Sequence, residues 1–197
     1  MSKIANAFKD GKAFIAFLTG GDPTPEKTVE YILTMEKAGA DLIEIGIPFS
    51  DPTAEGVVIQ DANIRALKAG TTTDKIFEIV KEVRKTSQIP LVFLTYLNPV
   101  FHYGYDAFFK KCKEYQVDGL IIPDLPYEEK HEVTDVADLY GVDIISMIAP
   151  TSKQRIQMIA SEAKGFIYIV SSMGVTGVRS EITTDIPGIV EAIRQVS

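Results

Sequence analysis

The feature that most constrains the fold of this chain is a series of short apolar runs separated by longer amphipathic stretches. The runs are rich in Ile, Val, Leu and Phe and mostly lack the polar alternation of a strand with one wet face. Six runs are expected to be strands: Ala13–Leu18, Asp41–Ile45, Pro90–Tyr96, Gly119–Ile122, Asp143–Ile148 and Gly165–Val170. Strands buried on both faces belong to parallel sheets, so the sequence predicts an α/β protein.

Helix patterns fill the spaces between these runs. In Thr73–Thr86 apolar residues recur at i, i+3, i+4 and i+7 and form one stripe, and Glu128–Tyr140 repeats the pattern. Thr24 followed by Pro25 predicts an N-cap with proline in the first turn, and Asp185 opens the last helix in the same way. Strict alternation of strand and helix with short connections indicates right-handed crossovers in one sheet.

Residues 1–197 are therefore expected to form a single domain of six βα units. A doubly wound open sheet and a (β/α)₈ TIM barrel both satisfy the pattern. The first turn, residues 19–23, lacks the glycine fingerprint of dinucleotide-binding sheets. Polar residues at the carboxyl ends of several strands favour the barrel, in which such residues build the site. Because six units are two short of eight, the barrel is expected to be incomplete at its C-terminal end.

Composition limits the partners of the chain. The formal net charge of −7 argues against nucleic acid and against an anionic membrane. The single cysteine, Cys112, excludes an internal disulfide and fits a reducing, cytoplasmic location. We expect no secretory leader and no membrane span, because no apolar segment near Met1 or elsewhere is long enough.

Glu44 is the most informative single residue, because it lies inside the apolar run Asp41–Ile45. If Ile43 and Ile45 face the helices, alternation turns Glu44 toward the barrel interior. Burial there would raise the pKa of its carboxyl group and suit it to proton transfer near neutral pH. The alternative is a structural glutamate paired with a buried hydroxyl or arginine.

Two loops carry further candidates. The segment 48–56 is long and rich in Asp, Glu and Pro, and from it Glu55 could reach over the barrel mouth, although a solvated loop charge is the commoner reading. The segment 171–180 combines glycines with hydroxyls, which suits either a mobile lid and anion cradle or an ordinary flexible loop. Phe17, Tyr96 and Tyr168, near strand ends, could line a pocket for a flat ring or simply pack the core.

The residue types that are missing from the predicted site narrow the reactions that it could catalyse. No lysine lies within the apolar body of a predicted strand, which argues against a Schiff-base aldolase. His102 and His131 are not spaced as metal ligands, so no metal site is expected. Carboxylate acid–base chemistry remains.

Several motifs together resemble the tryptophan synthase alpha family. The long run Ile43–Gln60 resembles the family's signature of strand two and its loop. Shorter matches follow in family order along the chain: Phe17–Pro23, Thr95–Pro99, Pro123–Pro126 and Tyr168–Gly177.

The resemblance implies a (β/α)₈ barrel that splits indole-3-glycerol phosphate into indole and glyceraldehyde 3-phosphate in tryptophan biosynthesis. Glu44 matches the catalytic glutamate, and Glu55 matches the second carboxylate, which accepts from the indole N–H. Five residues match substrate-binding positions: Phe17, Tyr96, Tyr168, Thr176 and Gly177.

The resemblance also implies a partner. Pro48 and Asp51 match the surface that contacts the beta subunit in an alpha2beta2 assembly. That subunit carries pyridoxal phosphate, whereas the alpha chain needs no cofactor.

Three departures from the family pattern matter. Glu55 stands where aspartate is usual, and Val57 stands where proline is usual, which would loosen the loop. The chain ends at Ser197, so no residue can be assigned to the family's main phosphate site, which follows strands seven and eight. This fragment alone is therefore expected to be impaired.

Two other functions stay open at this point. One is a truncated, non-catalytic alpha chain that only docks on the beta subunit. The other is a different phosphate-binding barrel enzyme, such as a sugar-phosphate epimerase, which would be expected to carry metal-ligand histidines at strand ends.

Overall fold

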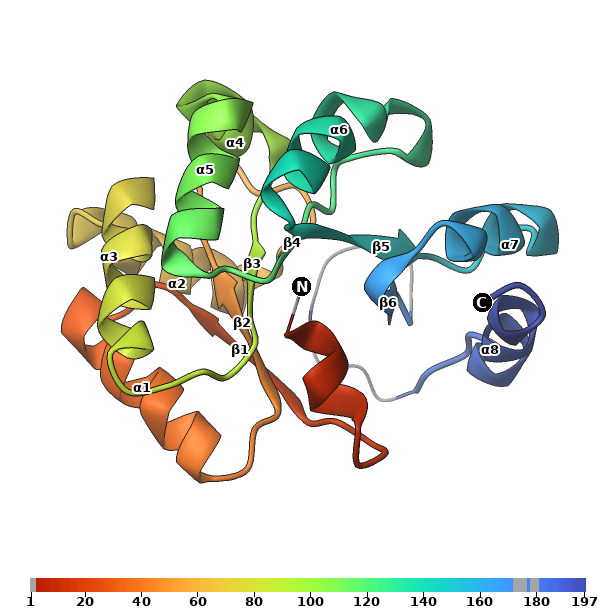
Figure 1. Ribbon diagram of the computed structural model, residues 1–197, viewed down its shortest axis with the longest axis horizontal. Coiled ribbons are helices and arrows are strands. Elements are labelled where there is room, and N and C mark those ends of the chain that lie inside the picture. Colours follow the sequence, from red (N-terminus) through yellow and green to blue (C-terminus); the bar gives the residue numbers. More distant parts are fainter. Residues whose placement is uncertain (1–2, 172–176, 178–180) are drawn as a thin grey trace.

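A computed structural model describes residues 3–171, 177 and 181–197. The chain forms one parallel six-stranded sheet in the order β1-β2-β3-β4-β5-β6, curved into a half-barrel with helices on its outer side (Figure 1). The strands are β1 (Ile15–Thr19), β2 (Leu42–Gly46), β3 (Leu91–Leu94), β4 (Gly119–Ile121), β5 (Asp143–Ile148) and β6 (Lys164–Ile169). All six predicted strands are confirmed, and neighbours in space are neighbours in sequence, as in a barrel.

Helices α1 to α7 lie between successive strands, and α8 follows β6. They are α1 (Pro25–Lys37), α2 (Val57–Lys68), α3 (Thr73–Arg84), α4 (Leu97–Tyr103), α5 (Tyr105–Tyr115), α6 (His131–Tyr140), α7 (Lys153–Ser161) and α8 (Ile186–Arg194), with short 3-10 turns η1 (Ile4–Phe8) and η2 (Tyr127–Glu129). The predicted caps are confirmed, because Thr24 accepts from the N–H of Lys27 and Asp185 accepts from the N–H of Gly188. The helix predicted from Glu128 begins three residues later, after η2.

Strand alternation divides the apolar residues into two layers. Ile43, Ile45 and Phe93 pack against the helices in the larger core. Their strand neighbours face the hollow of the half-barrel and form a second cluster, whose buried members are Ile4, Leu42, Val92, Ile121 and Ile145. Both faces of β2 are therefore dry, and every residue from Leu42 to Gly46 is buried.

The N-terminal turn η1 fills one end of this hollow. Ile4 is fully buried in the interior cluster, and Figure 1 shows η1 in the gap between β1 and β6. Asp118 anchors the turn: it accepts the N–H of Lys3 (3.0 Å) and of Leu91 (3.0 Å) and pairs with buried Arg84 at 3.2 Å. In the described part of the chain β1 pairs with β2 alone and β6 with β5 alone, which leaves two open edges.

The plug formed by η1 generates a stability prediction. Ile4→Ala removes a fully buried side chain from the interior cluster and should lower the free energy of unfolding by about 2–4 kcal/mol. Val58→Ala, at a position that is 78% exposed, is the control and should change it by less than about 0.5 kcal/mol. Urea unfolding of both variants measures the difference, and equal effects would show that η1 does not seal the interior.

Candidate active site

Glu44 lies in the middle of β2 on its interior face. Its neighbours Ile43 and Ile45 join the core beneath the helices, whereas Leu42 joins the interior cluster, so the predicted strand face is confirmed. Its side chain is 5% exposed, and burial raises the pKa of its carboxyl group to about 7. Among the described residues no hydrogen bond or ion pair reaches this carboxylate, and burial is the cause of its raised pKa.

Phe17 stands beside Glu44 on the neighbouring strand. The two residues are register partners between β1 and β2. The Phe17 ring comes within 3.0 Å of the place where a Cβ on Gly46 would lie. Gly46 at the end of β2 therefore leaves room for this aromatic wall. The role of Gly46 is not among the predictions from the sequence, although a glycine at the end of an apolar strand is the signal that could have indicated it.

Glu55 is buried, with 6% of its surface exposed, so the commoner reading of this residue as a solvated loop charge is wrong. It ends the long loop after β2, two residues before α2 begins. Its backbone carbonyl accepts a hydrogen bond of 2.7 Å from the side-chain amide of Gln60, in the first turn of α2. The start of that helix thus fixes the backbone that carries the carboxylate.

Tyr96 connects the Glu55 loop to β3. It follows β3, caps α4 and is 2% exposed. Its hydroxyl accepts the N–H of Ala54 at 2.9 Å, and the Glu55 carboxylate is a further hydrogen-bond partner. Burial, and then the charge of Glu55, raise the pKa of the Tyr96 phenol. Phe49 packs on its ring with 5.6 Å between centroids.

Tyr168 brings the two carboxylates into one site. It lies on the interior face of β6, beside the cluster that contains Leu42. Its phenol has a raised pKa, first through burial and then through the negative charges of Glu44 and Glu55. Because both carboxylates act on one hydroxyl, the structure gathers Glu44, Glu55 and Tyr168 within electrostatic reach across half the barrel.

The structure describes three of the four remaining predicted site residues. Thr176 lies outside the described residues. Gly177 is exposed, and nothing lies within 4 Å of a Cβ built on it. Of the two predicted partner-contact residues, Pro48 is buried and Asp51 is exposed.

Over residues 3–171, 177 and 181–197, no group of three or more His, Cys, Asp or Glu side chains is arranged to hold a metal ion. No helix in the same ranges is long and apolar enough to cross a membrane. The pKa of the Glu44 carboxyl group is raised toward neutrality, which suits this group to move a proton.

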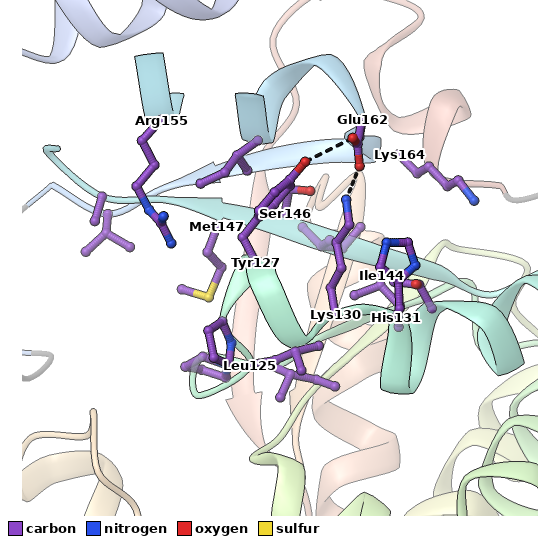
Figure 2. Close-up of a pocket in the computed structure, with 18 of the residues that line it drawn as sticks. Leu125, Tyr127, Lys130, His131, Ile144, Ser146, Met147, Arg155, Glu162 and Lys164 are labelled. Atoms are coloured by element: carbon purple, nitrogen blue, oxygen red, sulfur yellow. Dashed lines mark hydrogen bonds and ion pairs between the residues drawn. The ribbon is translucent and has the colours of Figure 1, made fainter. Parts of the chain in front are cut away.

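A cavity of about 460 Å³ lies elsewhere, between α6, β5 and α7 (Figure 2). Glu162, which lines the cavity, and Glu128, which pairs with the lining residue Arg155, have lowered pKa values, unlike Glu44. Lys130 and Tyr127 hold the pKa of Glu162 below its usual value, and Arg155 at the rim lowers the pKa of Glu128 to about 2. Carboxylates fixed in the ionised form by cations do not exchange protons near neutral pH, so we place the candidate active site at Glu44.

This chain is similar to known proteins in sequence and in structure. Residues 4–197 match the family model for the tryptophan synthase alpha chain. The chain is 52% identical to the tryptophan synthase alpha chain of Lacticaseibacillus casei over 195 residues, covering 99% of this chain and 73% of that protein. It is 50% identical to that of Lactiplantibacillus plantarum, covering 100% of this chain and 75% of the relative.

Solved structures give the same result. Mycobacterium tuberculosis tryptophan synthase superimposes with a TM-score of 0.90 at 31% identity, covering 100% of this chain and 77% of that chain. A chain of the tryptophan synthase α2β2 complex of Pyrococcus furiosus superimposes with a TM-score of 0.84 at 37% identity, covering 93% and 74%. The six-stranded half-barrel of this chain therefore belongs to the TIM-barrel fold.

The buried carboxyl group predicts a specific dependence of stability on pH. Its pKa is raised from 4.5 to about 7, so its contribution is fully present below about pH 4.5 and is lost as pH rises through about 7. This loss amounts to roughly 3 kcal/mol. Glu44→Gln does not titrate, so its stability relative to the unaltered chain should increase by that amount between about pH 4.5 and 8.

Glu128→Gln is the matched control for this measurement. Arg155 lowers the pKa of Glu128 from 4.5 to about 2, so its contribution is present above about pH 4.5 and is lost only below that value. Its difference from the unaltered chain should stay constant between about pH 5 and 8. Urea unfolding across this range tests both variants. A constant difference for Glu44→Gln would mean that Glu44 ionises normally in the folded chain.

Proposed function

Because the chain belongs to the tryptophan synthase alpha chain family, a family of lyases, we propose that it cleaves indole-3-glycerol phosphate to indole and glyceraldehyde 3-phosphate, with Glu44 as the proton carrier. The observation that carries the proposal is the Glu44 carboxyl group, buried in the half-barrel with a pKa of about 7. A group with this pKa is populated in both protonation states at neutral pH and can therefore both accept and donate a proton.

The reaction needs one proton moved between two atoms of the substrate. As the bond between indole C3 and the glycerol carbon breaks, the adjacent hydroxyl loses its proton and becomes the aldehyde. Indole C3 receives the bonding electron pair and gains a proton. Glu44 takes the first proton and supplies the second, so no external acid or oxidant is required. The dry environment that raises its pKa also keeps water from the reacting atoms.

Glu55 and the aromatic side chains serve the indole ring. The Glu55 carboxylate accepts from the indole N–H and stabilises the positive charge that develops on that nitrogen when C3 is protonated. Tyr96 supports this arrangement, because its hydroxyl contacts both Ala54 and Glu55. Phe17 and Tyr168, on the interior faces of β1 and β6, flank the flat ring. We also propose Thr176 and Gly177 as substrate-binding residues.

We further propose that the chain acts with a beta subunit in the cytoplasm and itself holds no cofactor. One structural neighbour, from Pyrococcus furiosus, is described as a subunit of an α2β2 complex. Exposed Asp51 and the loop around Pro48 are the proposed contact region. Passing indole directly to a partner is consistent with a site that opens at the carboxyl ends of the strands.

The decisive test of this function is Glu44→Gln. The variant keeps the size of the side chain and should lower indole release by at least about 10²-fold, the usual contribution of a general acid–base group. It is best measured in a version of this chain extended with the C-terminal part of the Lacticaseibacillus casei relative, with beta subunit present. Turnover near that of the unaltered protein would contradict the assignment of Glu44.

Glu55 gives a second test, in which two substitutions should separate charge from geometry. Glu55→Ala removes the acceptor for the indole N–H and should abolish cleavage, whereas Glu55→Asp keeps the carboxylate and should retain or improve it. Steady-state rates with indole-3-glycerol phosphate distinguish the two. If the aspartate variant loses as much activity as the alanine variant, the position of the loop matters and not its carboxylate.

A molecule that consists of residues 1–197 alone should be a poor enzyme. The edges of β1 and β6 leave backbone donors and acceptors unpaired, which favours association with other chains. Binding energy from a substrate phosphate is normally used at the reacting centre, and no described residue is assigned to bind it. Light scattering should therefore show oligomers, and indole release should be weak. A monodisperse monomer with ordinary turnover would refute this expectation and the alternative of a chain that only docks on the beta subunit.

A further inference from the structure

We propose that the ion pair between Asp22 and Arg65 is a positioning device that holds Glu55 in place relative to Glu44. The inference rests on the proposed function, in which both carboxylates act on one substrate. Arg65 donates to Asp22 from Nε at 2.9 Å and from Nη2 at 2.7 Å, so the guanidinium group grips the carboxylate with two parallel hydrogen bonds. This fork fixes direction as well as distance.

Asp22 belongs to a loop that is tied to the strand of Glu44. The N–H of Gly20 donates to the carbonyl of Gly46 at 2.9 Å, two residues beyond Glu44. The N–H of Gly21 donates to the Thr28 hydroxyl at 2.8 Å, which fixes the loop to α1.

The same loop leaves little room for movement. A Cβ on Gly20 would lie 2.5 Å from the Ile76 side chain, and Gly21, with φ of +82°, packs against Thr71. These contacts join the loop to α3 and to the connection before it. Asp22 is consequently presented from a rigid base, and its side chain is only 17% exposed.

Arg65 belongs to α2, which begins two residues after Glu55, and few side chains of this helix are buried. The buried residues of α2 are Ala62, Asn63 and Ala66, whereas those of α3 are Ile76, Phe77, Ile79, Val80 and Val83. Burial of small side chains stabilises an attachment far less than burial of large ones, because the effect scales with apolar area. Val57 and Val58, in the first turn of α2, are 72% and 78% exposed.

The pair therefore links the supports of the two carboxylates. One end rests on the loop bound to β2, which holds Glu44, and the other rests on α2, whose first turn holds the backbone of Glu55 through Gln60. Arg65 lies two turns beyond the start of α2, about 12 Å along the helix. A rotation or slide of α2 would therefore displace Glu55. Site geometry must hold to roughly half an ångström to be productive, so this attachment bears on activity.

The experiment compares Arg65→Gln, Arg65→Lys and Asp22→Asn with Arg155→Gln in the chain Met1–Ser197. The control pair is matched: Arg155 also donates two hydrogen bonds to a carboxylate, that of Glu128, at 2.6 and 3.1 Å, with both side chains exposed. Two readouts need no catalysis. One is hydrogen–deuterium exchange of residues 53–60. The other is ¹³C NMR titration of labelled tyrosine, with the Tyr96 signal assigned from Tyr96→Phe.

The three pair variants should exchange residues 53–60 about three- to tenfold faster than the unaltered chain, since they lose a local anchor. The raised pKa of Tyr96 should fall toward its ordinary value as Glu55 moves away and the phenol gains water. Arg65→Lys keeps the positive charge but loses the two parallel hydrogen bonds. Its exchange rate and its Tyr96 pKa should therefore lie between those of the unaltered chain and those of Arg65→Gln. Arg155→Gln should change neither readout. If Arg65→Gln fails to fold, Arg65→Lys and Asp22→Asn decide the matter.

Failure of this inference and failure of the function are distinguishable. Pair variants that match Arg155→Gln in both readouts overturn the positioning role, even where Glu44→Gln abolishes turnover. Faster exchange with a lowered Tyr96 pKa supports the positioning role, even where Glu44→Gln retains turnover and the proposed function fails.

Discussion

A carboxyl group held in a strand that is dry on both faces is the constraint on which this structure depends. β2 packs against the helices through Ile43 and Ile45 and against the interior through Leu42, and it leaves Glu44 little contact with water. Ionising this group in the folded chain costs roughly 3 kcal/mol, a large share of the 5–15 kcal/mol that stabilises a typical domain. This cost of ionisation is the physical basis of the proposal that Glu44 carries the proton.

The rest of the half-barrel keeps this position dry. At one end of the hollow, η1 inserts Ile4, and the network of Asp118, Arg84 and Lys3 holds the turn in place. At the other end, the loop after β2 folds back so that Glu55 is buried against Tyr96. The hollow is thus filled from below by apolar side chains and bordered above by polar ones, as in barrel enzymes generally.

The outer layer shows that the same residue types behave differently in another environment. Around the cavity between α6 and α7, carboxylates meet lysine and arginine partners in solvent, and their pKa values fall. Around Glu44, burial acts alone and the pKa rises. The Asp22–Arg65 pair is likewise a carboxylate paired with a cation. Because it joins a rigid loop to a helix with few buried side chains, its proposed role is to position Glu55.

The sequence by itself determined the α/β class, the six strands, the capped starts of α1 and α8, and the interior direction of Glu44. These features follow from local rules, since apolar alternation and helix caps are set by neighbours along the chain. It also indicated the family, through the long run Ile43–Gln60. Only the tertiary structure decided that Glu55 is buried, that Tyr96 contacts it and that Arg65 pairs with Asp22. Such contacts join segments dozens of residues apart, and their burial depends on how separate elements pack, which no local pattern encodes.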